Sequence, residues 1–200
     1  MPVTLNEPLS GLQKFGEMLM ASDELLRRAS VTKDPIKRHA LAMISGFTGL
    51  HVTKIRKRKP FNPMLGETYE FVNDKFRLIC EKVTHIPEQV VCFHQEGEKY
   101  TVNAYNRAMK PAFKFNGGKG MVEIMQTGAQ NIHLKNTGEH ISVSKPKILA
   151  KNLIWGGLYV DAEGKVESVC HETGSKGTLE FFEKKSNIKN SYLTGKVFDA

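Results

Sequence analysis

Apolar residues near the start of the chain recur at the spacing of an α-helix. They stand three or four positions apart, and Pro8, directly before them, is suited to a first helical turn. The members of this stripe are Leu9, Leu12, Phe15 and Leu19. A stripe of this kind usually packs one face of a helix against a protein core, and contact with a membrane is the alternative.

A second helix is predicted in DPIKRHALAMISGF, residues 34–47. Asp34 can cap its N-terminus, and Pro35 fits the first helical position, where a missing N–H costs no hydrogen bond. The apolar stripe of this helix comprises Ile36, Ala40, Met43, Ile44 and Phe47. Together the two stripes predict a helical lead-in over residues 1–52.

After residue 67 the helical spacing gives way to short runs rich in β-branched and aromatic residues. Turn-forming stretches such as NDK, QEGE, NGGKG and NTGE separate these runs. The runs are TYEFV, FRLICEKV, QVVCFH, KYTVNAY, MVEIMQT, NIHLK and HISVS, and then LIWGGLYV, KVESVCHE and TLEFFEK, with turns at DAEG and TGSKG between the last three. Because no helical segment intervenes, the pattern predicts an antiparallel meander of about ten strands over residues 68–200, in a sandwich or barrel.

The length and composition agree with this outline. The chain has 200 residues, enough for one domain or part of a larger one, and its hydrophobic fraction of 40% can form a packed core. The final stretch, SYLTGKVFDA, predicts a strand that needs a partner further on, since an unpaired edge invites association. We therefore expect a partial domain that can self-associate through an open sheet edge.

A net charge of +8 favours anionic partners, which include nucleic acid, a charged membrane and phosphorylated ligands. The cations concentrate in KIRKRKPFNPMLGETYEF, residues 54–71. Five of them fall within six positions: Lys54, Arg56, Lys57, Arg58 and Lys59. The segment 53–67, here called the basic elbow, is thus the first candidate for a functional site.

Three interpretations of the basic elbow are open. A solvated surface is the usual fate of a charge run, and a nucleic-acid patch is weakened by the lack of aromatic residues within the run. The third is a site for a lipid headgroup or phosphate. Pro60 and Pro63 stiffen the backbone, and Gly66 permits a sharp turn into the first strand, so Lys59 and Asn62 would be held in defined positions.

No motif in the chain specifies a catalytic or metal centre. The histidines are dispersed, without HExxH, and no serine lies in GxSxG. The glycine-rich GGKG at 117–120 fits a hairpin turn better than a phosphate loop. The histidines are His39, His51, His85, His94, His133, His140 and His171. We expect neither an enzyme nor a bound cofactor or metal.

The cysteines and the N-terminus indicate a compartment. Cys80, Cys92 and Cys170 are too few and too scattered for a disulfide framework, which fits a reducing environment. The first residues, MPVTLNEPLS, lack the pattern of a signal peptide, and the apolar run HALAMISGFTGLHV is too short to span a bilayer. The expected location is the cytoplasm.

The stretch LICEKVTHIPEQVV, residues 78–91, is the second candidate for a site. A strand is predicted to run to Val83, after which Thr84, His85 and Pro87 interrupt it. His85 is therefore expected at the rim of the sheet, where its imidazole can donate to phosphate near neutral pH. A purely structural histidine is the commoner alternative.

These stretches resemble the lipid-binding domain of the oxysterol-binding protein family. KPFNPMLGETYE is similar to that family's KPFNPLLGETYE, and EKVTHIPE, residues 81–88, is similar to its fingerprint EQVSHHPP. The likeness extends from about Pro2 to Gly195, through the helical lead-in and the late hairpins. Within the fingerprint Glu81, Val83, His85 and Pro87 match, whereas Lys82, Thr84, Ile86 and Glu88 depart from it.

The resemblance implies an α+β fold: N-terminal helices followed by a large antiparallel β-meander that forms part of an incomplete β-barrel around a lipid tunnel. It also implies headgroup roles for Lys59, Asn62 and His85, which match the family residues that hold the phosphate of phosphatidylinositol 4-phosphate. Ile86 replaces the second histidine of the fingerprint and has no donor. The family's remaining headgroup residues correspond to positions beyond residue 200, and its lid precedes the helical lead-in.

The function implied is binding and transfer of a sterol or a phosphoinositide between membranes. Lys54, Arg56, Lys57 and Arg58 would face an anionic membrane surface, to which the protein would bind peripherally. The alternative is a membrane-surface or protein-interaction module that keeps the scaffold without transferring lipid. Nucleic-acid binding is not expected, because it rests on charge alone.

Overall fold

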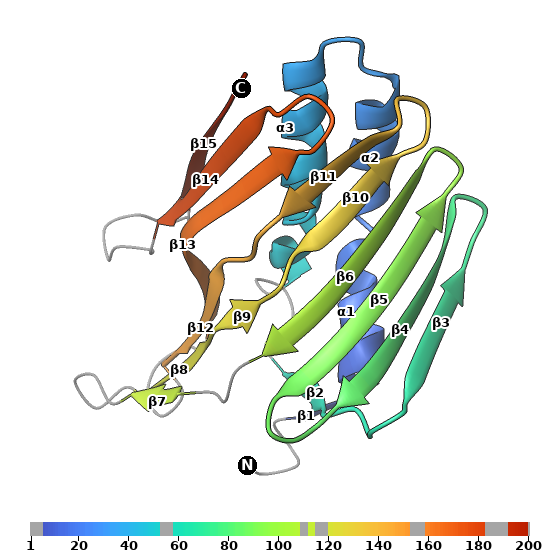
Figure 1. Cartoon of the computed structure of the whole chain (residues 1–200). Helices are drawn as coiled ribbons and strands as arrows, with labels where there is room; N and C mark the ends of the chain where they lie inside the picture. The colour runs from blue at the N-terminus through green and yellow to red at the C-terminus, as the bar shows by residue number, and fades with distance from the viewer. Residues whose placement is uncertain are drawn as a thin grey trace.

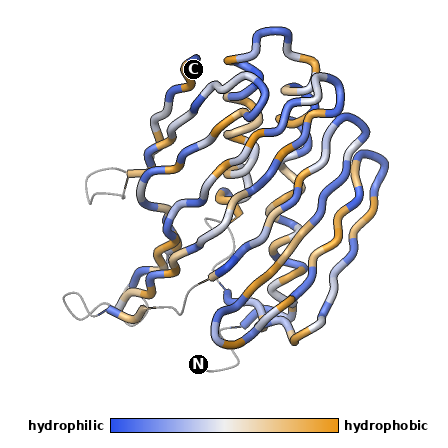
Figure 2. Tube along the Cα trace, in the orientation of Figure 1, coloured by the Kyte–Doolittle hydropathy of each residue, from blue (hydrophilic) through white to orange (hydrophobic). Residues whose placement is uncertain are grey.

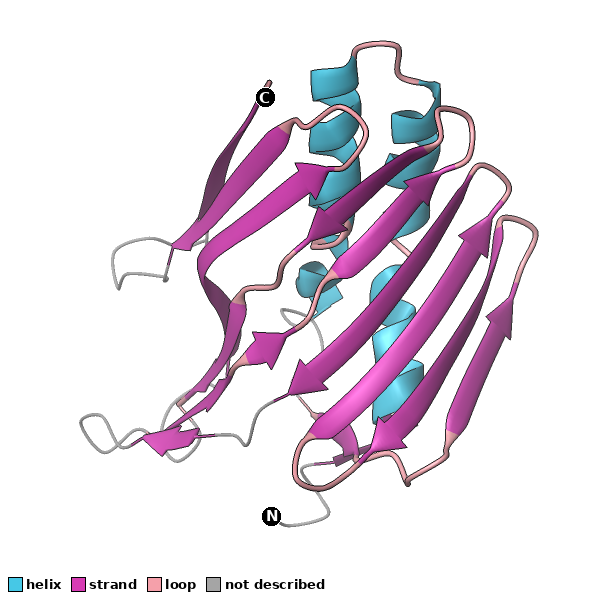
Figure 3. Ribbon diagram, in the orientation of Figure 1, coloured by secondary structure: helices cyan, strands magenta, loops and turns pink. Residues whose placement is uncertain are grey.

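Helices cover one face of a large antiparallel sheet in the computed structural model, which describes residues 6–52, 58–108, 112–114, 120–152, 159–182 and 192–199 (Figures 1 and 3). The helices are α1 (Gly11–Leu19), α2 (Ser22–Val31) and α3 (Pro35–Ser45), and a 3-10 turn, η2 (Thr48–His51), follows them. α1 packs against β3 and β4, α2 against β6 and β10, and α3 against β11, β14 and β15.

The strands divide into a small parallel pair and a large antiparallel sheet. The pair is β1 (Asn6–Ser10) with β2 (Lys59–Phe61). The sheet contains β3 (Thr68–Val72), β4 (Phe76–Thr84), β5 (Gln89–Gly97), β6 (Tyr100–Ala108), β7 (Ala112–Lys114), β8 (Met121–Ile124), β9 (Gln126–Thr127), β10 (Gln130–Leu134), β11 (Glu139–Val143), β12 (Lys147–Lys151), β13 (Tyr159–Cys170), β14 (Lys176–Phe182) and β15 (Tyr192–Phe198).

Within the described residues the sheet stays open. Its path runs β3-β4-β5-β6-β10-β11-β13-β12-β8-β7, with β14 and β15 branching from β13 and β9 from β6. The predicted order of N-terminal helices followed by a large, unclosed antiparallel sheet is therefore confirmed. None of the described helices is both long and apolar enough to cross a bilayer.

The start of the first helix differs from the prediction. Pro8 lies in β1 rather than in a helical turn, and α1 begins at Gly11 after Ser10, whose hydroxyl accepts a hydrogen bond from the Leu12 N–H at 3.3 Å. The cause is long-range, because residues 6–10 are extended by pairing with residues 59–61 of the basic elbow. Local spacing carries no signal of that partner.

The start of α3 agrees with the prediction, and its buried face agrees only in part, since Met43 is buried and Phe47 packs against the core as predicted. Asp34 accepts hydrogen bonds from the N–H groups of Ile36 and Lys37, at 2.9 and 3.2 Å, and Pro35 is the first helical residue. Ile44, predicted to pack inward, is 40% exposed. The buried residues of α3 are Arg38, His39, Ala42, Met43 and Ser45. This face is buried because Arg38 pairs with Glu139 of β11, and because His39 forms hydrogen bonds with the hydroxyls of Ser168 on β13 and Ser175 in the β13–β14 turn.

The predicted turn at DAEG is wrong, since β13 runs through it without a break from Tyr159 to Cys170. β13 pairs with β12 over residues 159–163 and with β14 over residues 164–169, so it bridges two parts of the sheet. Gly164 has a φ of 101°, a left-handed value that lets the strand change direction between those partners. The predicted turn at TGSKG is confirmed between β13 and β14.

The predicted strand count of about ten is too low, because short strands were merged or missed. The single run MVEIMQT forms both β8 and β9, which pair with different neighbours. β1, β2, β7 and β12 had no counterpart in the prediction. In the predicted turn GGKG, residues 117–119 lie outside the described residues.

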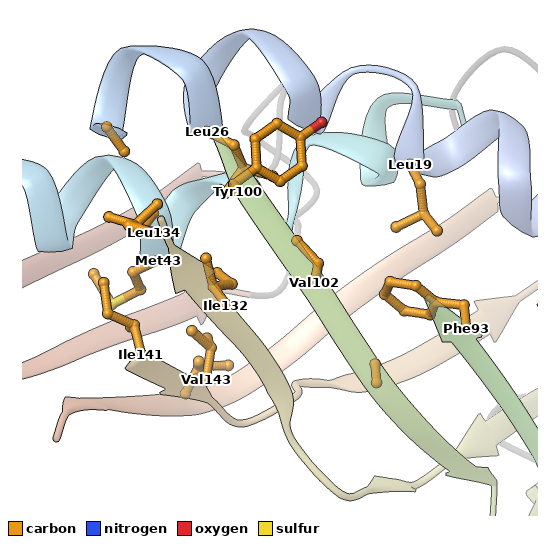
Figure 4. Packing of buried hydrophobic residues seen from close by; sticks show 14 of the residues in the cluster. Leu19, Leu26, Met43, Phe93, Tyr100, Val102, Ile132, Leu134, Ile141 and Val143 are labelled. Atoms are coloured by element: carbon orange, nitrogen blue, oxygen red, sulfur yellow. The ribbon is translucent and has the colours of Figure 1, made fainter. Parts of the chain in front are cut away.

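The core lies between the helices and the inner face of the sheet. Along β4, Phe76, Leu78 and Cys80 are buried while Arg77 and Ile79 are exposed. Figure 2 colours the chain by hydropathy and shows hydrophobic and hydrophilic residues interspersed along the strands. In Figure 4 the side chains of Leu19, Leu26 and Met43 point from the helices toward side chains of β5, β6, β10 and β11. The sheet residues labelled there are Phe93, Tyr100, Val102, Ile132, Leu134, Ile141 and Val143.

Candidate functional site

Two of the predicted headgroup residues touch each other. The ammonium of exposed Lys59 donates to the side-chain oxygen of Asn62 at 2.9 Å and to the backbone carbonyl of Pro60 at 3.0 Å. Lys59 begins β2, and Asn62 follows the end of that strand. The pairing of β2 with β1 thus presents a cation and an amide side by side, both open to solvent.

The carboxylate of Glu67 holds the rest of the elbow in place. One of its oxygens accepts from the hydroxyl of Ser10, and the other accepts from the N–H of Met64 at 2.8 Å. The N–H of Gly66, whose φ is 77°, donates to the carbonyl of Lys82 at 2.9 Å. These bonds tie the elbow both to the cap of α1 and to β4.

His85 lies in the turn between β4 and β5, as its predicted rim position requires. It is exposed, and its neighbour Ile86 is 82% exposed. Figure 1 places the β4–β5 turn at the same end of the sheet as β1 and β2. The structure therefore brings Lys59 and Asn62 into contact and sets His85 at the same end of the molecule.

Of the four cations predicted to face a membrane, the structure describes one, Arg58. Lys54, Arg56 and Lys57 lie outside the described residues. Arg58 is exposed, and its carbonyl accepts from the ammonium of Lys14 at 2.9 Å. Lys14 also forms an ion pair with Glu7 at 2.5 Å, so α1 is fastened to β1 and to the residue that precedes β2.

A cavity of about 450 Å³, here called the α1 cavity, lies between the helical segment and the inner face of the sheet. Most of its lining is apolar, as is usual for a small-molecule site. The lining residues are Gly11, Lys14, Phe15, Met18, Leu19, Ser45, Gly46, Phe47, Gly49, Leu50, Pro60, Phe93, Asn106, Ile124, Gln126, Gln130, Ser144, Lys145, Pro146 and Ile148. Pro60 belongs to β2, so the cavity adjoins the strand that carries Lys59.

Two polar groups of the cavity wall are buried without a hydrogen-bond partner among the described residues: the ammonium of Lys145 and the amide nitrogen of Asn106. Burial lowers the pKa of Lys145 from 10.5 to about 8. Sequence reasoning missed both residues. Lys145 falls in a short linker between strands, where a lysine is ordinarily taken as solvated.

A second buried lysine lies near the elbow. Lys82 is 1% exposed on the inner face of β4, and its ammonium donates to the side-chain oxygen of Gln89 at 3.0 Å. Burial lowers the pKa of Lys82. In the fingerprint EQVSHHPP described above, the position of Lys82 is a glutamine. The substitution therefore places a buried cation near the rim that carries His85.

Other candidate chemistry is weaker. His133 and His140, which are separated in the sequence, stack with ring centroids 4.2 Å apart, and His140 pairs with Glu172 at 2.7 Å. Among the described residues no group of three or more His, Cys, Asp or Glu side chains could hold a metal ion. Cys80, Cys92 and Cys170 are all free thiols. A shallower hollow of about 400 Å³ near Cys92 and Tyr105 contains neither of the two unpaired groups of the α1 cavity.

Comparison with known proteins gives one consistent result. The family model described as oxysterol-binding protein matches residues 1–200. Oxysterol-binding protein-related protein 1 of mouse and that of human are each 37% identical over 183 residues, which cover 90% of this chain and 19% of theirs. Oxysterol-binding protein homolog 3 of Saccharomyces cerevisiae is 37% identical over 187 residues, 90% of this chain and 18% of that protein.

Solved structures with a similar fold carry lipids. The Osh3 ORD of Saccharomyces cerevisiae in complex with PI(4)P is 33% identical, with a TM-score of 0.76, and the match covers 96% of this chain and 50% of that one. The Osh1 ORD in complex with ergosterol is 27% identical, with a TM-score of 0.83, and covers 100% of this chain and 47% of the other. This chain therefore spans about half the length of these structures and about a fifth of the relatives named above.

Proposed function

Because this chain belongs to the oxysterol-binding protein family, we propose that it binds a sterol or a phosphoinositide and carries that lipid between membranes, without catalysing a reaction. The observation that carries the proposal is the largely apolar α1 cavity next to the strand of Lys59. Hydrocarbon buried in such a cavity gains about 0.8 kcal/mol for each CH₂ group.

The rim would hold the headgroup. Lys59 and His85 can form charge-assisted hydrogen bonds with phosphate oxygens, and Asn62 can donate to the same group. The existing contact between Lys59 and Asn62 supports this assignment, because it holds both side chains at one place before a ligand arrives. Ile86 adds no donor, which weakens the site relative to a fingerprint with two histidines.

Peripheral attachment to a membrane would use the same end of the protein. Arg58 is exposed there, and Lys54, Arg56 and Lys57 precede it in sequence. Met64 and Leu65 are 74% and 68% exposed, so the elbow offers apolar side chains beside its cations. Each lysine or arginine near an anionic surface contributes about 1 kcal/mol. We propose a cytoplasmic protein that contacts membranes through this face.

The alternative function is a membrane-surface or protein-interaction module that does not extract lipid. The exposed Ile86, in place of a phosphate-binding histidine, is the observation that favours it. Native mass spectrometry of the purified 200-residue chain separates the two functions. Stoichiometric bound lipid supports the carrier, whereas a lipid-free chain that still binds liposomes supports the surface module.

The headgroup site is tested by Lys59→Ala. Loss of a charge-assisted bond should weaken binding to liposomes containing phosphatidylinositol 4-phosphate by about 1.5–3 kcal/mol. Lys75→Ala is the matched control, because Lys75 is exposed in the β3–β4 turn, at the opposite end of β4 from His85. Equal losses for the two variants would mean that the liposomes are bound by diffuse charge rather than by a site at Lys59.

A further inference from the structure

Lys145 is held in a fixed place by its neighbours in the linker between β11 and β12. The hydroxyl of Ser144 accepts from the N–H of Glu167 at 2.9 Å, and the N–H of Ser144 donates to the carbonyl of Glu167 at 2.9 Å. Pro146 is buried and restricts the backbone on the other side. The linker is thus fastened to β13, and Lys145 is directed into the wall of the α1 cavity rather than into solvent.

No acidic side chain lines the described part of the α1 cavity, so this buried ammonium has no counter-charge there. The titratable residues that line the α1 cavity are Lys14 and Lys145, and Lys14 is already paired with Glu7. Cys92 on β5 is the group that interacts electrostatically with Lys145. Burial raises the pKa of the Cys92 thiol above its ordinary value of 9.0, so this thiol is neutral at physiological pH and cannot balance the lysine.

A buried, unpaired ammonium is costly, and native proteins rarely keep one without a use. Within the described residues, the side chain of Asn106 adds a second buried donor that has no partner on the same cavity wall. The two donors of Lys145 and Asn106, set in a largely apolar cavity, fit a ligand that has both oxygen acceptors and a hydrocarbon part. The flexible four-carbon side chain of Lys145 ends in three donor hydrogens that such an oxygen can accept.

We propose that the α1 cavity accepts a lipid carboxylate, acid end inward, held by the ammonium of Lys145 and the amide of Asn106. This inference rests on the proposed lipid-binding function and names a ligand class for the same cavity. One lysine neutralises the single negative charge of a carboxylate. A phosphate monoester carries about −1.5 to −2 charges at neutral pH and would leave buried charge uncompensated.

The test compares three probes that share one 18-carbon chain: oleate, oleyl alcohol and oleyl phosphate, each below its aggregation concentration. The wild-type chain should bind oleate about ten- to a hundredfold more tightly than oleyl alcohol, the range for a hydrogen bond to a charged group. Oleyl phosphate should bind more weakly than oleate. Lys145→Met, which keeps the length of the side chain without its charge, should abolish the preference for oleate while leaving the affinity for oleyl alcohol in place.

Lys147→Met is the matched control. Lys147 is two positions away, but its ammonium pairs with Glu123 at 2.9 Å and the residue is not part of the cavity lining. This variant should keep the wild-type preference for oleate. Thermal unfolding of both variants verifies that each is folded before binding is compared.

A second readout is proton uptake. At pH 9 the empty site is mostly uncharged, because the pKa of Lys145 is about 8, and a bound carboxylate favours the ammonium. Oleate binding at this pH should therefore take up a proton, measured by calorimetry in two buffers of different ionisation enthalpy. Lys145→Met should take up none.

The outcomes separate this inference from the function it rests on. Unchanged oleate preference in Lys145→Met, tighter binding of oleyl phosphate than of oleate, or binding without proton uptake would overturn the carboxylate site. Each of these results leaves the proposed lipid carrier intact if the wild-type chain binds sterol. A wild-type chain that binds none of the probes, no sterol and no phosphoinositide would refute the carrier function, and the carboxylate site with it.

Discussion

Polar side chains are buried in two regions: where α3 contacts the sheet, and in the wall of the α1 cavity. The two regions differ in whether these side chains have hydrogen-bond partners among the described residues. At the α3 contact, Arg38 forms a bidentate pair with Glu139 of β11, with two N···O distances of 2.5 Å. The same guanidinium donates to the carbonyls of Thr32 and Lys33. In the cavity wall, Lys145 and Asn106 have donors without a partner among the residues that the structure describes. The buried polar side chains that attach α3 to the sheet therefore have hydrogen-bond partners.

His39 illustrates the satisfied region further. It is 1% exposed, and its two ring nitrogens lie 2.8 and 2.9 Å from the hydroxyls of Ser175 and Ser168. Burial lowers the pKa of the imidazole, so the neutral form bridges α3 to the β13–β14 hairpin. This contrast suggests how to distinguish buried polar groups with a structural role from those with a functional role. Structural groups form hydrogen bonds within the chain, whereas functional groups have donors or acceptors that a ligand can pair with.

Breaking the satisfied region should have the largest effect. Arg38→Ala removes the counter-charge of the buried Glu139 carboxylate and leaves it the hydrogen bond from the Thr137 hydroxyl, and we expect the free energy of unfolding to fall by about 3–5 kcal/mol. Arg77→Ala is the control, because Arg77 is exposed and lies 3.6 Å from Glu96, a pair worth at most about 1 kcal/mol. Urea unfolding of both variants measures the difference. Similar losses for Arg38 and Arg77 would remove the distinction between a fastening pair and a surface pair.

Removing the unpaired charge should have the opposite sign. Lys145→Met eliminates a buried ammonium that has no partner in the described part of the chain, and we expect the lipid-free chain to gain about 1–3 kcal/mol of stability. A loss of stability instead would show that the ammonium contributes to folding, as Arg38 does.

The gain from Lys145→Met should also depend on pH. The pKa of Lys145 is lowered to about 8 in the folded chain, against 10.5 when unfolded, so the native state binds fewer protons between those values. Wild-type stability therefore rises relative to the variant as pH increases from 8 to 10.5, and the penalty is complete below pH 8. Melting temperatures of the two proteins, measured in parallel across this window, should converge at high pH. A constant difference would contradict the assignment.

The smallest effect is expected where α2 contacts β5 and β6, because Asp23 of α2 forms hydrogen bonds with two partners, Tyr100 and Arg27. The hydroxyl of Tyr100 donates to the carboxylate of Asp23 at 2.8 Å and accepts from the amide of Gln95 at 3.0 Å. Tyr100→Phe should cost about 1–2 kcal/mol, since Asp23 keeps its bond with Arg27. Tyr105→Phe, on the exposed face of β6, should change stability by less than about 0.5 kcal/mol. The measurement is again urea unfolding, and equal effects would mean that the buried network contributes nothing beyond surface hydroxyls.

The sequence by itself determined the features that depend on neighbouring residues. The cap at Asp34 and Pro35, the change from helical spacing to strands after residue 67, and the turn at Gly66 all follow from local backbone chemistry. The motifs around Lys59 and His85 also identified the family, because long motifs survive where overall identity is modest. The rim residues could thus be named before any coordinates were known, although their role in binding remains a proposal.

Only the tertiary structure decided which side chains lose contact with water and which partners they then find. Pairing between residues 6–10 and 59–61 turned a predicted helical start into a strand, and a glycine at 164 let one strand serve two neighbours where a turn was predicted. Lys145 reads in the sequence as one more surface cation. Its burial arises from the linker fastened to β13 and from the cavity beside it. Solvation is a property of the assembled chain, so no local pattern could have distinguished this lysine from its neighbour Lys147.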